Sequence, residues 1–181
     1  MVDVRTAFGL PMPIFTCSPL RSRRSKRCRR GTYAEKVKPS SLDELPEWAV
    51  GLLHEERVGR LALLDDVAHP RVLPVTYVIA AGSVWTAVDD KPKVVAGPDV
   101  ARVRFLRERP QAAFLVDRYD DDWERLAWVQ VLGAVDVLEV DVLPEALAAL
   151  RAKYGPYAER PPRGPLLRLV PERCLCWRAA G

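Results

Sequence analysis

Short β-type runs separated by tight turns are the feature that most limits how this chain can fold. Runs rich in β-branched and aromatic residues recur at 58–64, 72–79, 84–88, 112–119, 126–140, 166–170 and 174–178. Turns rich in Asp or Gly follow several of them, at residues 65–66, 81–83 and 120–122. Strands joined this closely pair antiparallel, because a parallel pair needs a long crossover connection. The pattern predicts a mainly β domain of six or seven strands with flanking helices, closed as a barrel rather than spread as a parallel α/β sheet.

Three helices are expected beside these strands. Capping residues at 40–44 precede apolar residues at helical spacing, which predicts a helix that ends near Glu56. A second helix is expected over residues 99–108, between two prolines. A third, rich in Ala and Leu, is expected over residues 144–154 and stops at Gly155.

The basic charge of the chain is concentrated in its first 38 residues. The formal net charge is +4, but residues 1–38 hold ten Lys or Arg against two acids, so the remainder is acidic at −4. This charge density predicts a disordered extension over residues 1–39 and a folded domain over residues 40–181. The extension either has no defined role or makes a polybasic contact with nucleic acid or an anionic membrane. The acidic body argues against nucleic-acid binding by the folded domain.

The composition predicts a cytoplasmic protein with no membrane span. The longest uncharged stretch, residues 72–88, is interrupted by polar residues, proline and glycine, whereas a membrane helix needs about 20 apolar residues. The basic residues follow the apolar stretch at 7–15 instead of preceding it, which does not fit a secretion signal. Cys174 and Cys176 are expected to be free thiols. With two histidines in the chain we expect no metal site, and the three acids at 120–122 are interpreted as a solvated turn.

One local cluster suggests a phosphate site. Pro74 removes a donor from its strand, which marks an edge strand or one whose backbone can meet a ligand. The following hairpin leads to Lys91 and Lys93 at the exit of a strand, where free backbone amides are expected, and then to the helix that carries Arg102 and Arg104. The alternative is that the two lysines are solvated loop charges. The chain has no glycine motif of a nucleotide-binding loop and no motif that identifies a catalytic nucleophile, so we predict no catalytic side chain.

Three segments of this region resemble the pyridoxamine 5'-phosphate oxidase-like split-barrel superfamily. They are residues 57–65 (RVGRLALLD), 70–77 (PRVLPVTY) and 84–93 (VWTAVDDKPK). A later run, 114–123 (FLVDRYDDDW), is followed by 126–129 (LAWV) and Gly133, and is similar to the actinobacterial branch of coenzyme F420-dependent enzymes. The resemblance covers residues 42–179.

This resemblance implies a six-stranded antiparallel split β-barrel that works as a homodimer, with two cofactors in the grooves between subunits. It implies a coenzyme F420-dependent oxidoreductase that transfers a hydride from the reduced deazaflavin to a small-molecule acceptor. A close rival is an oxidoreductase of the same fold that uses FMN. A third possibility is a protein that binds a flavin or haem without turnover.

The cofactor-binding residues that the resemblance implies fall into three groups. Those whose backbone lies along the tricyclic ring are Pro74, Val75 and Thr76. Those that hold the phosphate are Ala87, Val88, Lys91 and Lys93, assisted by Arg102 or Arg104. The third group is Trp128 and Trp177, which match aromatic positions near the dimer groove. Either would form a wall of the cofactor site of the neighbouring subunit.

The chain departs from the family pattern in two places. Relatives usually carry Gly-Arg-Pro-His where this chain has Ala68-His69-Pro70-Arg71, so the turn before the second strand lacks its glycine. Basic residues often follow the lysine pair in relatives, and here they are replaced by the uncharged residues 94–97.

Overall fold

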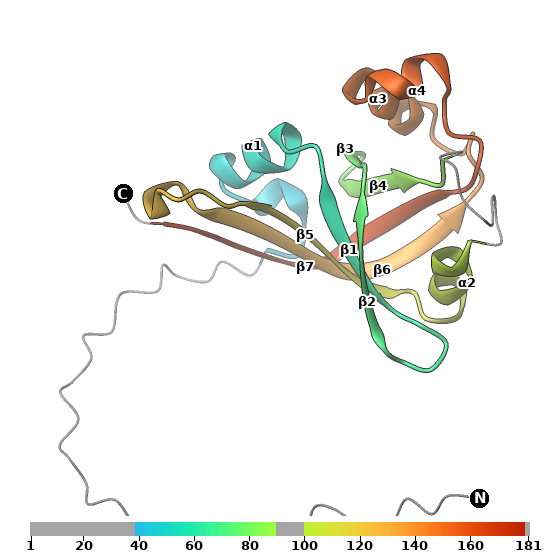
Figure 1. The fold of residues 1–181 in the computed structure, drawn as a ribbon, viewed down its shortest axis with the longest axis horizontal. Coiled ribbons are helices and arrows are strands. Elements are labelled where there is room, and N and C mark those ends of the chain that lie inside the picture. The colour runs from blue at the N-terminus through green and yellow to red at the C-terminus, as the bar shows by residue number, and fades with distance from the viewer. Residues whose placement is uncertain (1–38, 90–99, 180–181) are drawn as a thin grey trace, which may run out of the picture. The chain divides into compact units, whose positions relative to one another are not determined.

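All the strands that the structure describes belong to one antiparallel sheet. The structure is a computed structural model that describes residues 39–89 and 100–179. Within these ranges the strands are β1 (Gly59–Leu64), β2 (Pro70–Val75), β3 (Val78–Ala80), β4 (Ser83–Ala87), β5 (Gln111–Arg118), β6 (Ala127–Leu138) and β7 (Leu166–Arg178). Their order across the sheet is β2-β1-β5-β6-β7-β4-β3. The expected mainly β architecture with flanking helices is confirmed (Figure 1).

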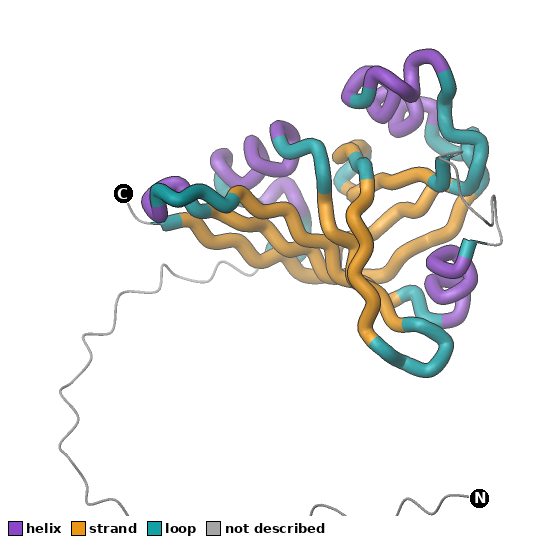
Figure 2. Tube along the Cα trace, viewed as in Figure 1, coloured by secondary structure: helices purple, strands orange, loops and turns teal. Residues whose placement is uncertain are grey.

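The strand order explains why the sheet curls into a half-barrel. β2 and β3 are its two edges, yet only Thr76 and Tyr77 separate them along the chain. The sheet must therefore curve until its edges meet, and Figure 2 shows this curvature. Tyr77 occupies the junction, fully buried, with its ring edge-to-face against Phe114 at 4.7 Å between centroids. Its hydroxyl donates to the Leu53 carbonyl at 2.7 Å.

The prediction of six strands is wrong, because the described sheet has seven. The single strand expected over residues 72–79 is divided, since the chain leaves β1 at Val75 and begins to pair with β4 at Val78. The runs expected at 166–170 and 174–178 form one strand, β7. A shift in the β6–β7 register opposite Leu132 and Gly133 accommodates the polar break between these runs. Pro74 lies in β2, so the edge position predicted for it is confirmed.

The three expected helices are present, and a fourth follows them. The helices are α1 (Glu47–Glu55), α2 (Ala101–Glu108), α3 (Pro144–Lys153) and α4 (Gly155–Glu159), with the short 3-10 helices η1 (Leu42–Glu44) and η3 (Trp123–Arg125). The sequence pattern ended the third helix at Gly155, where α4 in fact begins. Among the described residues, every helix is too short and too polar to cross a membrane.

The position of β4 determines where a site can form. All five of its residues are buried, because apolar clusters cover both of its faces. Val84 faces the larger cluster inside the curled sheet, whereas Trp85 and Ala87 face a smaller cluster under α3 and α4. The end of β4 is therefore enclosed by protein on both sides, and the segment expected to bind phosphate begins there.

Candidate functional site

The chain leaving β4 is held by the segment that precedes β7. The Val88 N–H donates to the Pro165 carbonyl at 3.0 Å, and the Gly164 N–H donates to the Val88 carbonyl at 3.2 Å. Both backbone groups of Val88 are thus used within the protein, and the free amide expected at this strand exit is not found at Val88. Lys91 and Lys93 lie outside the described residues.

Helix α2 brings Arg102, rather than Arg104, to the end of β4. The Arg102 Nη2 donates a long hydrogen bond to the Ala87 carbonyl at 3.5 Å. Its Nε is buried without a hydrogen-bond partner among the described residues. Burial lowers the pKa of Arg102, and the nearby Asp89 opposes this shift. Arg104 is exposed and lies over the Phe105 ring, so of the two arginines predicted it is Arg102 that has an unused donor beside the strand exit.

Helix α4 joins the two parts of the predicted cofactor site through Tyr157. The Tyr157 hydroxyl donates to Asp89 Oδ2 at 2.6 Å and lies 2.8 Å from Thr76 Oγ1. Tyr157 is 5% exposed and Asp89 8%. Burial, with the Asp89 carboxylate as a further cause, raises the pKa of Tyr157, so this phenol stays protonated at neutral pH. Sequence reasoning missed Tyr157, because Gly155 predicts the end of the preceding helix and nothing in the sequence after it suggests a site.

Tyr154 fixes the backbone next to Thr76. Its hydroxyl accepts a hydrogen bond from the Tyr77 N–H at 2.9 Å. The same hydroxyl lies 2.8 Å from the Tyr77 carbonyl and 2.9 Å from the Arg57 carbonyl, so its one proton is shared between two acceptors. Tyr154 therefore satisfies the backbone at the junction of β2 and β3, where no ladder continues, and thereby holds Thr76 in place.

Lys153 lies against the aromatic residues of this junction. Its Nζ is 4.0 Å from the centroid of the Tyr77 ring and 5.9 Å from that of Tyr154. Burial, reinforced by the positive charge of Arg57, lowers the pKa of Lys153 to about 8. The unfolded chain therefore holds a proton on this amine between pH 8 and its ordinary value of 10.5, where the folded chain does not.

We expect Lys153→Met to flatten part of the pH dependence of stability. In the wild type, the free energy of unfolding gains a contribution as pH rises from 8 towards 10.5, because the unfolded state binds the additional proton. At pH 7 the wild type bears the cost of burying a charged amine, which Lys153→Met does not, so we expect the variant to be the more stable protein there. Lys153→Met lacks the gain at higher pH, so the difference in the free energy of unfolding shrinks by pH 10. Urea unfolding at pH 7, 8.5 and 10 measures the difference. Arg151→Met, at an exposed position of the same helix, is the control and should follow the wild-type slope.

The two predicted tryptophans lie far from the end of β4 within one chain. Trp128 and Trp177 are cross-strand partners in β6 and β7. Trp177 also lines a pocket of about 340 Å³ together with Trp123, Glu124, Leu126 and Ala179. Leu166, which pairs with Ala87, is at the other end of β7, about 36 Å of strand away from Trp177 at 3.3 Å per residue. One chain therefore does not bring the tryptophan pair and the β4 exit into one site.

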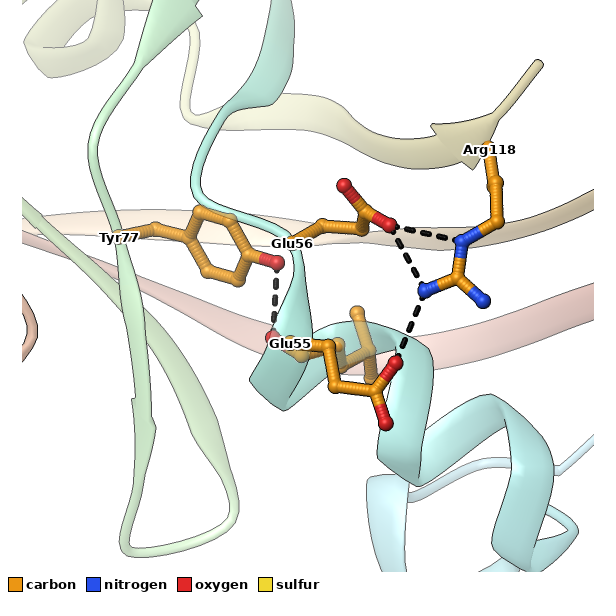
Figure 3. Close-up of polar contacts among 5 residues, drawn as sticks. Glu55, Glu56, Tyr77 and Arg118 are labelled. Carbon is orange, nitrogen blue, oxygen red and sulfur yellow. Dashed lines mark hydrogen bonds and ion pairs between the residues drawn. The ribbon is translucent and has the colours of Figure 1, made fainter. Parts of the chain in front are cut away.

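A second polar cluster, formed around Arg118, holds α1 against β5 (Figure 3). The Arg118 Nη2 donates to Glu55 at 2.8 Å, and its Nε and Nη2 donate to Glu56 at 3.0 and 2.9 Å. Hydrogen bonds from Glu55 and then Glu56 raise the pKa of Arg118. Beside these ion pairs lies a pocket of about 430 Å³ between α1 and the β5–β6 connection. The Arg118 guanidinium already forms ion pairs with Glu55 and Glu56, so we assign this cluster a structural role.

The acidic turn satisfies its own backbone. The Asp120 carboxylate accepts from the Asp122 N–H at 3.0 Å, and the Asp122 carboxylate accepts from the Glu124 N–H at 3.1 Å at the start of η3. Within the described ranges, no three His, Cys, Asp or Glu side chains come together as a metal site would require.

Comparison with known proteins identifies the fold. No family model matches the sequence, and no curated protein matches it. The fold is similar to a FAD-binding protein from Mesorhizobium loti (TM-score 0.52, 19% identity, covering 75% of this chain and 96% of that one). It is similar to a candidate pyridoxamine 5'-phosphate oxidase from Listeria innocua (TM-score 0.52, 17% identity, covering 70% of this chain and 93% of that one). It is also similar to the heme storage protein HutZ from Vibrio cholerae (TM-score 0.56, 14% identity, covering 71% of this chain and 90% of that one). The chain therefore has the split-barrel fold of these proteins.

Proposed function

We propose that this protein is an F420-dependent oxidoreductase whose cofactor phosphate lies at the exit of β4. The observation that carries the proposal is the buried Arg102 Nε, which has no partner among the described residues. A buried guanidinium donor is costly to leave unpaired, and phosphate oxygens match the donor geometry of arginine. Lys91 and Lys93 follow this exit in the sequence and would add positive charge to the same phosphate.

The residues present fit a flavin-type cofactor in a second respect. Thr76, from the segment proposed to lie along the ring with Pro74 and Val75, is linked through Tyr157 to Asp89 at the end of β4. Two segments proposed for different parts of one cofactor thus meet in space. When bound, a deazaflavin supplies hydride transfer with its own ring, and the protein's task is to orient the ring, exclude water and balance the phosphate charge.

The proposed assembly is a homodimer in which each groove is completed by the other subunit. Trp128 and Trp177 lie at the opposite end of the sheet from Ala87 and Val88, so in this proposal a tryptophan of one chain walls the groove of the other. Tyr119 and Trp123, which are 77% and 74% exposed, lie on the β5–β6 connection and give this end of the sheet further apolar surface.

Two alternatives use the same fold. An FMN-dependent oxidoreductase would use the same phosphate site, and similarity to a FAD-binding protein supports flavin binding in general. A haem-binding protein is supported by similarity to a heme storage protein. The chain has two histidines, His54 and His69, and both are exposed and outside the Thr76–Tyr157–Asp89 cluster. This arrangement favours a flavin or deazaflavin over a haem that a buried histidine would ligate.

Fluorescence titration with coenzyme F420, FMN and haem in parallel tests the proposal. We expect F420 to bind most tightly, both to the full-length protein and to a variant that lacks residues 1–38. The double variant Lys91→Ala/Lys93→Ala should weaken F420 binding by about 100-fold or more, because each of the two hydrogen bonds to a charged phosphate is worth about 1.5–3 kcal/mol. The melting temperature of the unliganded double variant should stay near that of the wild type.

The possible results separate the alternatives. Tight binding of FMN alone would indicate an FMN-dependent oxidoreductase that uses the same site. Tight binding of haem alone would support a haem-binding protein without turnover. Equal F420 affinity in the lysine double variant would remove the phosphate site proposed here. Loss of binding on deletion of residues 1–38 would show that the basic extension, and not the folded domain alone, holds the cofactor.

A further inference from the structure

The directions of two hydrogen bonds fix what the Thr76 hydroxyl can offer a ligand. Tyr157 has one hydroxyl proton, and it donates that proton to the Asp89 carboxylate at 2.6 Å. The contact of 2.8 Å between Tyr157 and Thr76 therefore has Thr76 as its donor, because the Tyr157 oxygen has only lone pairs left. Thr76 therefore donates its only hydroxyl proton to Tyr157. Its oxygen faces any further partner as an acceptor only.

The surroundings keep this orientation in place. An ionised carboxylate only accepts hydrogen bonds, and Arg102 interacts electrostatically with Asp89 from α2. Tyr157 and Asp89 are both buried, so water does not compete for the bond between them. Burial and the neighbouring carboxylate raise the pKa of Tyr157, which keeps the donated proton on the phenol.

We infer that the chain from Thr76 through Tyr157 to Asp89 makes the Thr76 hydroxyl an obligate acceptor, which selects a protonated ring nitrogen of the bound heterocycle over an unprotonated one. The inference rests on the proposed function, which lays the ring along Pro74, Val75 and Thr76. Tyr157 and Asp89 are positioning residues in this arrangement, because they act on the ligand only through Thr76.

The preference has a consequence for the redox state that the protein binds. Two-electron reduction of a flavin or deazaflavin ring adds a proton to a ring nitrogen that carried only a lone pair in the oxidised form, and the inference places this nitrogen, not the imide N–H that both forms carry, against the Thr76 hydroxyl. A hydroxyl that only accepts can form a hydrogen bond with the N–H of the reduced ring. With the oxidised ring its oxygen lies against a nitrogen lone pair, and no hydrogen bond forms. The site therefore binds reduced cofactor more tightly than oxidised cofactor.

The ratio of affinities for the two redox forms tests the inference. FMN or coenzyme F420, whichever the wild type binds, is titrated in its oxidised and its chemically reduced form under anaerobic conditions. Tyr157→Phe frees the Thr76 proton, so the hydroxyl can donate to the oxidised ring. We expect the reduced-to-oxidised affinity ratio to fall by about tenfold, mainly because the oxidised form binds more tightly.

Three further variants separate positioning from a general effect on structure. Thr76→Val removes the hydroxyl, so the ratio falls because reduced cofactor binds less tightly, and Thr76→Ser restores the wild-type ratio. Ser40→Ala removes an exposed hydroxyl outside the proposed site and should leave the ratio unchanged. A loss of packing would weaken both redox forms equally.

The inference and the proposed function fail in different ways. If neither cofactor binds the wild type, the proposed function is wrong. If cofactor binds and Tyr157→Phe or Thr76→Val leaves the ratio at its wild-type value, the proposed function stands and the inference about Thr76 is overturned. A shift of the ratio in favour of the reduced form in Tyr157→Phe also overturns it.

Discussion

Gly133→Ala is expected to destabilise the fold by about 3 kcal/mol or more, at the upper end of what overpacking a core costs. A Cβ at this position would lie 1.9 Å from the backbone oxygen of Val170. Gly133 is where the register between β6 and β7 shifts, so the facing backbone approaches closely there. A backbone oxygen cannot rotate away as the tip of a side chain can, so the two longest strands of the described sheet would have to move apart.

Chemical unfolding of the purified variants measures this effect. Gly155→Ala is the matched control, because a Cβ on Gly155 meets no atom within 4 Å, and we expect its stability to stay within about 0.5 kcal/mol of the wild type. Equal stability of Gly133→Ala and the wild type would show that β6 and β7 are not in contact at this point as described.

The regular elements could be predicted because local patterns determine them. Residues 58–64, 84–88 and 112–119 have the β-type composition of buried strands, and the structure has a strand at each. The boundaries that failed depend on distant partners. The run at 72–79 is uncharged and, apart from Pro74, β-type in composition, but it is divided where one end pairs with β1 and the other with β4. No property of the run itself indicates that break.

Part of the candidate site could be predicted and part could not. Thr76, Ala87 and Arg102 follow from a resemblance carried by local runs, and the structure brings these three segments together. Tyr157 joins Thr76 across 81 residues of sequence, and its helix begins with a Gly-Pro pair that usually marks a stop. A contact of this range depends on the curled sheet and has no local signal.

The turn before β2 shows how a departure from the family pattern is accommodated. The chain has Ala68 where relatives usually carry glycine, and the structure holds Ala68 at φ 63°, in the left-handed region that glycine favours. The turn is held by the Asp65 carboxylate, which accepts from the Val67 and His69 N–H groups at 3.2 and 2.8 Å. The turn therefore adopts a conformation that glycine favours without having a glycine, and the Asp65 carboxylate stabilises it.

Arg102→Gln is expected to weaken binding of the phosphate-bearing cofactor by about 10- to 100-fold, because hydrogen bonds to a charged group are worth about 1.5–3 kcal/mol. The glutamine keeps the polarity and much of the length of the side chain but removes the positive charge and the guanidinium Nε. In the wild type that Nε is buried beside the end of β4 and has no partner among the described residues, so in the proposed site it is free to donate to the phosphate.

A comparison of two arginines on the same helix makes this test specific. Arg107→Gln removes one positive charge from an exposed position of α2, so it reproduces the change in net charge without touching the strand exit. We expect Arg107→Gln to change cofactor affinity less than about twofold at physiological salt, where exposed charges are screened. Titration of both variants with F420 and with a phosphate-free ring analogue shows whether the lost affinity depends on the phosphate. The affinity for the analogue should be the same in Arg102→Gln and the wild type. If Arg102→Gln weakens binding of both ligands equally, Arg102 maintains the shape of the groove and does not bind the phosphate.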